Sequence, residues 1–99
     1  MVRWIRTAQI APGKMMPALA WSKEIAGFVK KYKEISSIDV FMDAFGDYGT
    51  IRWIVDYNDL ASLEKVGQQI ANDQEYWQKV ENFSDLFVGT VNDVVMRSI

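Results

Sequence analysis

The fold of this chain is indicated most directly by residues 38–57, IDVFMDAFGDYGTIRWIVDY. Two alternating runs flank the turn at residues 46–49, whose glycines supply the backbone freedom that a tight hairpin needs. Successive residues of a strand point to opposite sides, and both sides of these runs carry apolar groups. Beyond one regular apolar row, Phe41, Phe45 and Ile54 lie on the second face. The stretch therefore predicts a hairpin with two apolar faces.

The second apolar face indicates a partner surface. In an antiparallel sheet the protein's own helices cover one face, and the other face commonly meets water. Large apolar groups on that other face need a cover, and an identical subunit is the simplest one. We therefore expect a homodimer, with Phe41, Phe45 and Ile54 as candidate interface residues.

Composition narrows the class of protein. The 99 residues suffice for a single domain, residues 1–99, with its own hydrophobic core. The net charge is -2 and no basic stripe with interleaved aromatic residues occurs, so we expect no binding to nucleic acid. No run approaches the roughly 20 apolar residues of a membrane span, so we expect no membrane partner and a soluble, cytoplasmic protein.

The chain has neither cysteine nor histidine. These residues supply most of the ligands of transition metals and of haem iron, and histidine is also the commonest general base. The acidic residues are scattered and lack the spacing of a calcium-binding loop. We therefore expect no metal site and no cofactor.

Periodicity outside the hairpin completes the fold prediction. A first apolar run ends at Pro12-Gly13, after which apolar residues recur at helical spacing. The expected elements are strands at 2–10, 38–45, 51–57 and 88–99, helices at 15–33 and from 58 to a break near Asn72, then a short further helix and a connector at 81–87. The order is βαββαβ: an α+β, ferredoxin-like domain with a four-stranded antiparallel sheet and two helices on one face.

Local features accompany this order. Pro12-Gly13-Lys14 leads into the first helix, Gly49 precedes Ile51-Arg52-Trp53, and Asp59-Leu60 opens the second helix. In these features and in element order the chain resembles the dimeric α/β barrel superfamily, and it is similar in style to NIPSNAP-like and antibiotic-biosynthesis-monooxygenase-like members. The resemblance implies two ferredoxin-like subunits that press their open sheet faces together. It also implies a range of activities: cofactor-free oxygenation of polycyclic phenols, haem degradation, lactone isomerisation and ligand sensing.

Tryptophans are the leading candidates for contacts with a ligand. Trp21 lies on the first expected helix and Trp53 on the third expected strand, and these elements pack together in this fold. If the resemblance extends to ligand binding, both indoles border a cavity between helices and sheet, with Asp43 or Arg52 as the nearest ionisable group. Alternation puts Arg52 and Trp53 on opposite faces, so both line one wall only if a bulge intervenes. We expect Trp53 on the helix side.

Each candidate also has a structural interpretation. The tryptophans could fill the core or an interface, since each buries a large area. Asp43 is flanked on its face by Phe41 and Phe45, so burial would raise its pKa toward that of a general base. Alternatively, Asp43 and Arg52 belong to ion pairs across strands or across a dimer interface. The sequence names no catalytic residue.

Three functions stay open on the sequence alone. The first is a homodimeric protein that binds a small hydrophobic or aromatic metabolite between helices and sheet. The second is a cofactor-free monooxygenase or isomerase of the dimeric α/β barrel type. The third is a structural or interaction subunit without a ligand. A cavity bordered by Trp21 or Trp53 favours the first two functions, and a filled core favours the third.

Overall fold

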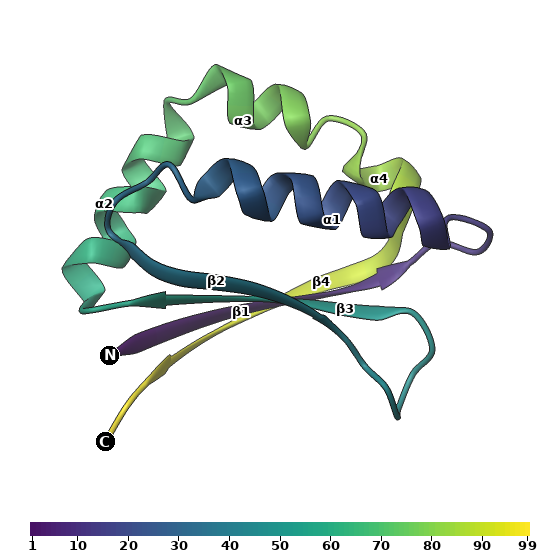
Figure 1. Ribbon diagram of the computed structural model, residues 1–99, viewed down its shortest axis with the longest axis horizontal. Coiled ribbons are helices and arrows are strands. Elements are labelled where there is room, and N and C mark those ends of the chain that lie inside the picture. The colour runs from purple at the N-terminus through teal and green to yellow at the C-terminus, as the bar shows by residue number, and fades with distance from the viewer.

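The computed structural model describes residues 1–99, and all of its helices lie on one side of a single sheet (Figure 1). The elements are β1 (Val2–Ile10), α1 (Met15–Val29), β2 (Ile35–Met42), β3 (Thr50–Tyr57), α2 (Leu60–Ala71), α3 (Gln74–Lys79), α4 (Phe83–Leu86) and β4 (Phe87–Arg97). The strands pair antiparallel in the order β2-β3-β1-β4. This confirms the expected α+β, ferredoxin-like fold. The short helix expected after Asn72 is α3, and α4 lies in the segment expected to be a connector. None of the helices combines the length and the apolar character needed to cross a membrane.

The two faces of the sheet follow the alternation of the sequence. Along β3, every second residue from Ile51 to Tyr57 is buried beneath the helices. Arg52, Ile54 and Asp56 lie between them and therefore belong to the opposite face, which carries no helix (Figure 1). We call this helix-free side of the sheet the open face.

The first strand of the hairpin lies three residues earlier than the sequence predicts, at Ile35–Met42 instead of 38–45, whereas β3 matches the prediction to within one residue. The first strand of the hairpin ends at Met42 instead of residue 45, and the last ladder contact there is the bond from Asp43 N to Thr50 O. Phe45 therefore lies in the turn and is 96% exposed. Gly49 ends the turn at φ +81°, and a Cβ there would approach Gln9 Nε2 to 3.0 Å, so the position requires glycine.

The helix boundaries reflect local hydrogen bonds. The first helix ends at Val29 rather than at residue 33, because the backbone then tightens into turns from Phe28 to Tyr32. Asp59 caps α2 by accepting from Ser62 N at 2.8 Å, as expected. The cap of α3 is Asp73, one residue beyond the expected break at Asn72.

One irregularity sets the register of β4. The pairing of β1 with β4 shifts between Thr7 and Gln9, whose partners are Asn92 and Val88. The extra residues of β4 form a bulge that includes Gly89 at φ +76°. Beyond the bulge, Val91 and Asp93 lie on the helix side of the sheet, where Asp93 pairs with Arg6.

The hydrophobic core is divided into two clusters. One contains eight buried residues around Ile51, Trp53 and Ile25. The other contains six buried residues around Val55, Tyr57 and Val66. The partly buried rings of Phe28 and Tyr76 pack against both clusters and connect them.

Candidate functional site

A cavity of about 660 Å³ occupies the space between the two core clusters. We call it the helix-side cavity. Of its 19 lining residues, 17 are hydrophobic, and they come from the sheet, from α1, from α2 and from α3 to α4. The full lining is Trp4, Arg6, Trp21, Ile25, Val29, Ile38, Trp53, Val55, Tyr57, Leu63, Val66, Gly67, Ile70, Ala71, Tyr76, Trp77, Val80, Phe83 and Val91. Its volume and apolar walls are those of small-molecule sites in proteins.

Aromatic side chains form one end of the cavity. The rings of Trp21 and Trp53 meet edge to face with centroids 6.1 Å apart. Phe83 and Phe87 extend this cluster, with centroid distances to Trp21 of 5.6 Å each. Such contacts fix the ring planes, so this wall is a rigid surface against which a flat molecule can stack.

One ion pair lies at the cavity. Arg6 on β1 is paired in the sheet with Trp53 of β3 and with Asp93 of β4. Its Nε and Nη2 atoms donate to the two carboxylate oxygens of Asp93, each at 2.8 Å. The hydrogen bond from Arg6 holds the pKa of Asp93 below its usual range, and that of Arg6 is raised for the same reason. The guanidinium also lies over the ring of Trp4, 4.9 Å from its centroid.

Two tyrosines and one indole add further polar atoms. Burial raises the pKa of Tyr57 and of Tyr76, and in addition Arg6 lowers the pKa of Tyr76 while Asp93 raises it. The Tyr76 hydroxyl therefore lies within electrostatic range of the ion pair. Trp53 is only 5% exposed, and its Nε1 has no hydrogen-bond acceptor.

The third helix contributes Tyr76 and Trp77 to the lining of the cavity and is fastened at its first end by Asp73. This carboxylate accepts from Tyr76 N at the start of α3, from the Tyr32 hydroxyl and from Lys31 Nζ, the last at 2.6 Å. The hydrogen bond from Lys31 is the main cause that lowers the pKa of Asp73 to about 2. The segment that follows α1 thereby holds the beginning of α3.

The other end of α3 is also attached to α1. Trp21 Nε1 donates to the carbonyl oxygen of Lys79 at 2.7 Å, and Lys79 Nζ pairs with Glu24 at 3.1 Å. Because Trp21 is also a wall of the cavity, its indole joins the wall to the covering helix. A ligand that displaced Trp21 would break the bond that holds Lys79.

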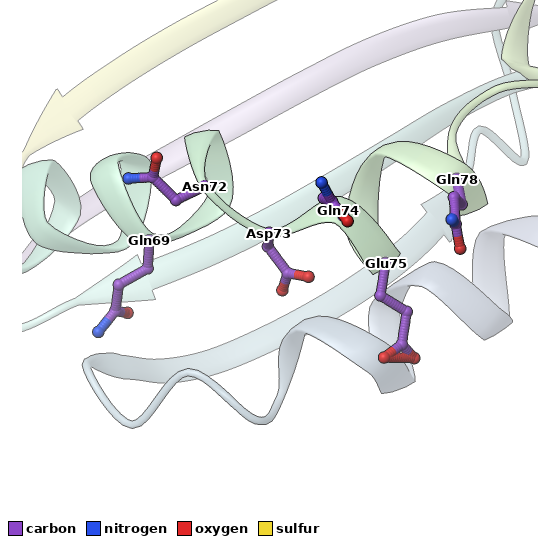
Figure 2. Close-up of a pocket in the computed structure, with 6 residues that line it drawn as sticks. All are labelled: Gln69, Asn72, Asp73, Gln74, Glu75 and Gln78. Atoms are coloured by element: carbon purple, nitrogen blue, oxygen red, sulfur yellow. The ribbon is translucent and has the colours of Figure 1, made fainter.

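A second hollow, of about 790 Å³, lies outside the core at the junction of α2 and α3 (Figure 2). Its lining is Gln69, Asn72, Asp73, Gln74, Glu75 and Gln78, with no hydrophobic residue. In Figure 2 the side chains of Gln69, Asp73 and Glu75 point to one side of the junction, and Asn72 points away from them. This hollow has no apolar surface to bury a ligand, and Asp73 is already bound by Lys31 and Tyr32. The helix-side cavity is therefore the better candidate site.

A comparison with models of protein families finds one family that matches nearly the whole chain. The family model described as NIPSNAP matches residues 3–98. The chain belongs to the NIPSNAP family. A search of curated proteins gives no match.

Solved structures share the fold of this NIPSNAP chain at low sequence identity. An uncharacterized NIPSNAP domain protein from Burkholderia xenovorans has a TM-score of 0.81 at 15% identity, over 100% of this chain and 95% of its own. An antibiotic biosynthesis monooxygenase has a TM-score of 0.79 at 18% identity, over 100% and 99% of the two chains. A NIPSNAP family protein from Agrobacterium tumefaciens has 0.78 at 18% identity, over 99% and 92%. At these identities the likeness shows the fold.

The structure of this NIPSNAP protein separates the four candidate ligand residues. Trp21 and Trp53 lie together at the helix-side cavity. Asp43 and Arg52 do not line it: they pair with each other on the open face, with Arg52 Nε 2.9 Å from Asp43 Oδ1. The hydrogen bond from Arg52 lowers the pKa of Asp43, whereas a buried general base would have a raised pKa. The cavity therefore has an ionisable residue in its lining, but that residue is Arg6 and not Asp43 or Arg52.

The candidate interface residues are placed differently from one another. Phe41 and Ile54 lie on the open face, and Phe41 is 54% exposed. Phe45 lies in the turn beyond the sheet. Ile5 and Val94 are the register neighbours of Ile54 across β1 and β4, so the open face has a continuous apolar row.

Sequence reasoning gave Tyr76 no role at the cavity, and it considered Arg6 as a clamp for a ligand carboxylate or phenolate or as part of an ion pair without placing it beside the tryptophans. Alternation along β1 was available as a signal, because Arg6 shares its face with Trp4 and with the buried Ala8. The position of Tyr76 depends on how α3 is folded over the sheet, which no local pattern indicates.

Proposed function

We propose that this NIPSNAP protein binds a small hydrophobic or aromatic molecule in the helix-side cavity. The observation that carries the proposal is the cavity itself, about 660 Å³ between the helices and the sheet of a 99-residue domain and partly open to solvent. A ligand that covers these apolar walls would remove them from water, so its binding would stabilise the folded chain. All four tryptophans of the chain line this space.

We also propose that the protein works as a homodimer joined through the open face. The apolar row of Ile5, Ile54 and Val94 runs across three strands that no helix covers (Figure 1). The exposed Phe41 adds to this surface. A second copy supplies a matching apolar face, as the two-fold symmetry of a homodimer requires.

Tryptophan fluorescence tests the binding proposal directly. Uncharged flat aromatic compounds such as fluorene and phenanthrene should quench emission saturably at micromolar concentration, because every indole borders the cavity. The same compounds should raise the melting temperature, and the rise should increase with the ligand concentration relative to Kd. Compounds that neither quench saturably nor raise the melting temperature below millimolar concentration would leave only a structural role.

Light scattering tests the dimer. A mass of twice the 11.4 kDa of the chain is expected at micromolar concentration. A mass equal to one chain would refute the proposed interface, and it would leave the binding proposal untouched because the cavity lies on the other side of the sheet.

A further inference from the structure

The helix-side cavity offers hydrogen-bond donors to a ligand and almost no acceptors. Its lining contains no Asp, Glu, Asn, Gln, Ser or Thr. The polar side chains that remain are Arg6, two tyrosines and the tryptophans. Guanidinium and indole N–H groups only donate, and a tyrosine hydroxyl both donates and accepts. A ligand that satisfies this lining must bring an acceptor.

Two of the indole donors are already used within the protein. Trp21 Nε1 donates to the Lys79 carbonyl at 2.7 Å, and Trp77 Nε1 donates to the Ile70 carbonyl at 3.0 Å. These two tryptophans contribute apolar surface to a ligand and no free polar atom.

Other donors have no partner in the protein. The bidentate pair of Arg6 with Asp93 uses Nε and Nη2, so Nη1 of this partly exposed guanidinium has no acceptor within the protein. The Tyr76 hydroxyl makes no hydrogen bond to the protein, although its backbone N–H bonds to Asp73. Trp53 Nε1, in the same wall as Arg6, is a fully buried donor without an acceptor. Because Trp53 Nε1 has almost no accessible surface, a ligand in the cavity would meet the donors of Arg6 and Tyr76 rather than this indole N–H.

Charge decides which acceptor fits. The positive charge of Arg6 is balanced by Asp93, and no other charged side chain lines the cavity. A ligand carboxylate would bring a second negative charge close to Asp93 and against apolar walls, which is unfavourable. A carbonyl oxygen accepts hydrogen bonds without adding charge.

We propose that Arg6 and Tyr76 select ligands of the helix-side cavity by an uncharged carbonyl oxygen carried on a flat apolar skeleton. Arg6, oriented by Asp93, donates from Nη1, and Tyr76 donates from its hydroxyl. The skeleton stacks on the aromatic wall of Trp21 and Trp53. This inference rests on the proposed function, because it names the chemical class of the ligand for the same cavity.

A matched pair of probes isolates the oxygen. Fluorene and 9-fluorenone share one skeleton and differ by the carbonyl group, so their affinity ratio reports the contact with that group. Measured by calorimetric titration, Tyr76→Phe and Arg6→Lys should each reduce the preference for 9-fluorenone about tenfold, since a bond to a charged or aligned donor contributes about 1.5 kcal/mol. The readout is the ratio of the two affinities measured in each variant, because a change in the lining that affects both probes alike cancels in that ratio.

Tyr48→Phe is the control, because Tyr48 lies in the β2–β3 turn and is 83% exposed. It should leave both affinities unchanged. A third probe, fluorene-2-carboxylate, should bind more weakly than 9-fluorenone. Tighter binding of the carboxylate would refute the uncharged class of ligand.

Infrared spectroscopy of the wild-type complex needs no variant. The carbonyl stretch of bound 9-fluorenone should lie at lower frequency than in an alkane solvent, as it does when the oxygen accepts hydrogen bonds. If both probes bind but the stretch matches the alkane value and the variants leave the ratio unchanged, the inference fails and the binding function stands. If neither probe binds, the binding function fails and takes the inference with it.

Discussion

Gly67 allows the helix-side cavity to be blocked without strain. It lies in α2 among the lining residues, and a Cβ built there meets no atom within 4 Å. Gly67 is exposed, so the variant Gly67→Leu places an isobutyl group in open space at the rim of the cavity rather than in packed atoms. The matched control is Gly27→Leu, since Gly27 is an exposed glycine of α1 that also meets no atom within 4 Å and does not line the cavity.

Both substitutions should stabilise the protein to a similar degree. Glycine inside a helix costs about 1 kcal/mol relative to alanine, and leucine is nearly as favourable as alanine, so the gain is about 0.8 kcal/mol. For a domain of this length that gain raises the melting temperature by about 3 to 6 °C. Differential scanning calorimetry should record this rise for Gly67→Leu and for Gly27→Leu.

Binding should separate the two variants. Overpacking of an occupied site typically costs about 1 to 3 kcal/mol, so Gly67→Leu should weaken fluorene binding by about 5- to 150-fold. Gly27→Leu should leave the affinity unchanged. If Gly67→Leu melts higher yet binds fluorene as the wild type does, the ligand does not occupy the helix-side cavity. If it melts lower than Gly27→Leu by several degrees, the space beside Gly67 is not open.

Three further predictions concern the interface, the attachment of α3 and the aromatic wall. Ile54→Asp puts a carboxylate opposite Asp39 in the middle of the open face and should halve the mass seen by light scattering, and an unchanged mass would exclude this face as the interface. Asp73, with its pKa lowered from 3.8 to about 2, stabilises the fold above pH 4 and loses that contribution as pH falls toward 2. Asp73→Asn should therefore melt lower at pH 7 and show a smaller fall in melting temperature between pH 4 and pH 2; an equal fall would contradict the assignment. Trp53→Ala removes a ring that is 5% exposed and should cost about 3 to 5 kcal/mol in urea unfolding, and a cost under about 1 kcal/mol would mean that the ring is not packed.

The faces of the strands could be predicted because the period of a strand is rigid. The alternation of residues 51–57 placed Trp53 toward the helices and Arg52 and Ile54 away from them, as observed. A shared wall of Arg52 and Trp53 required a bulge in β3, and the β1–β3 register is continuous. Asp43, on the same face as Arg52, is therefore also outside the cavity.

The polar part of the cavity could not be predicted, because it depends on contacts between distant segments. Arg6 and Asp93 are 87 residues apart, and the bulge at Gly89 sets which residue of β4 meets Arg6. A bulge of this kind changes the register without leaving a periodic signal. Tyr76 reaches the site through α3, whose position depends on the bonds that Asp73 and Trp21 make with other helices.

Hydrogen bonds join the two ends of the chain. The strands could therefore be connected in a different order along the chain without changing how they pair in the sheet. The ammonium group of Met1 donates to Ser98 Oγ at 3.0 Å, and Ser98 N donates to Met1 O at 3.0 Å, at one end of the sheet (Figure 1). A short peptide link from Ile99 to Met1, with the chain reopened between Phe45 and Gly46, would give a circular permutant with the same sheet. In that permutant β1 and β4 become a local hairpin, while β2 and β3 lie at opposite ends of the chain. Comparing its folding rate with that of the native order would reveal which hairpin forms first, since pairing of neighbouring segments is the faster route.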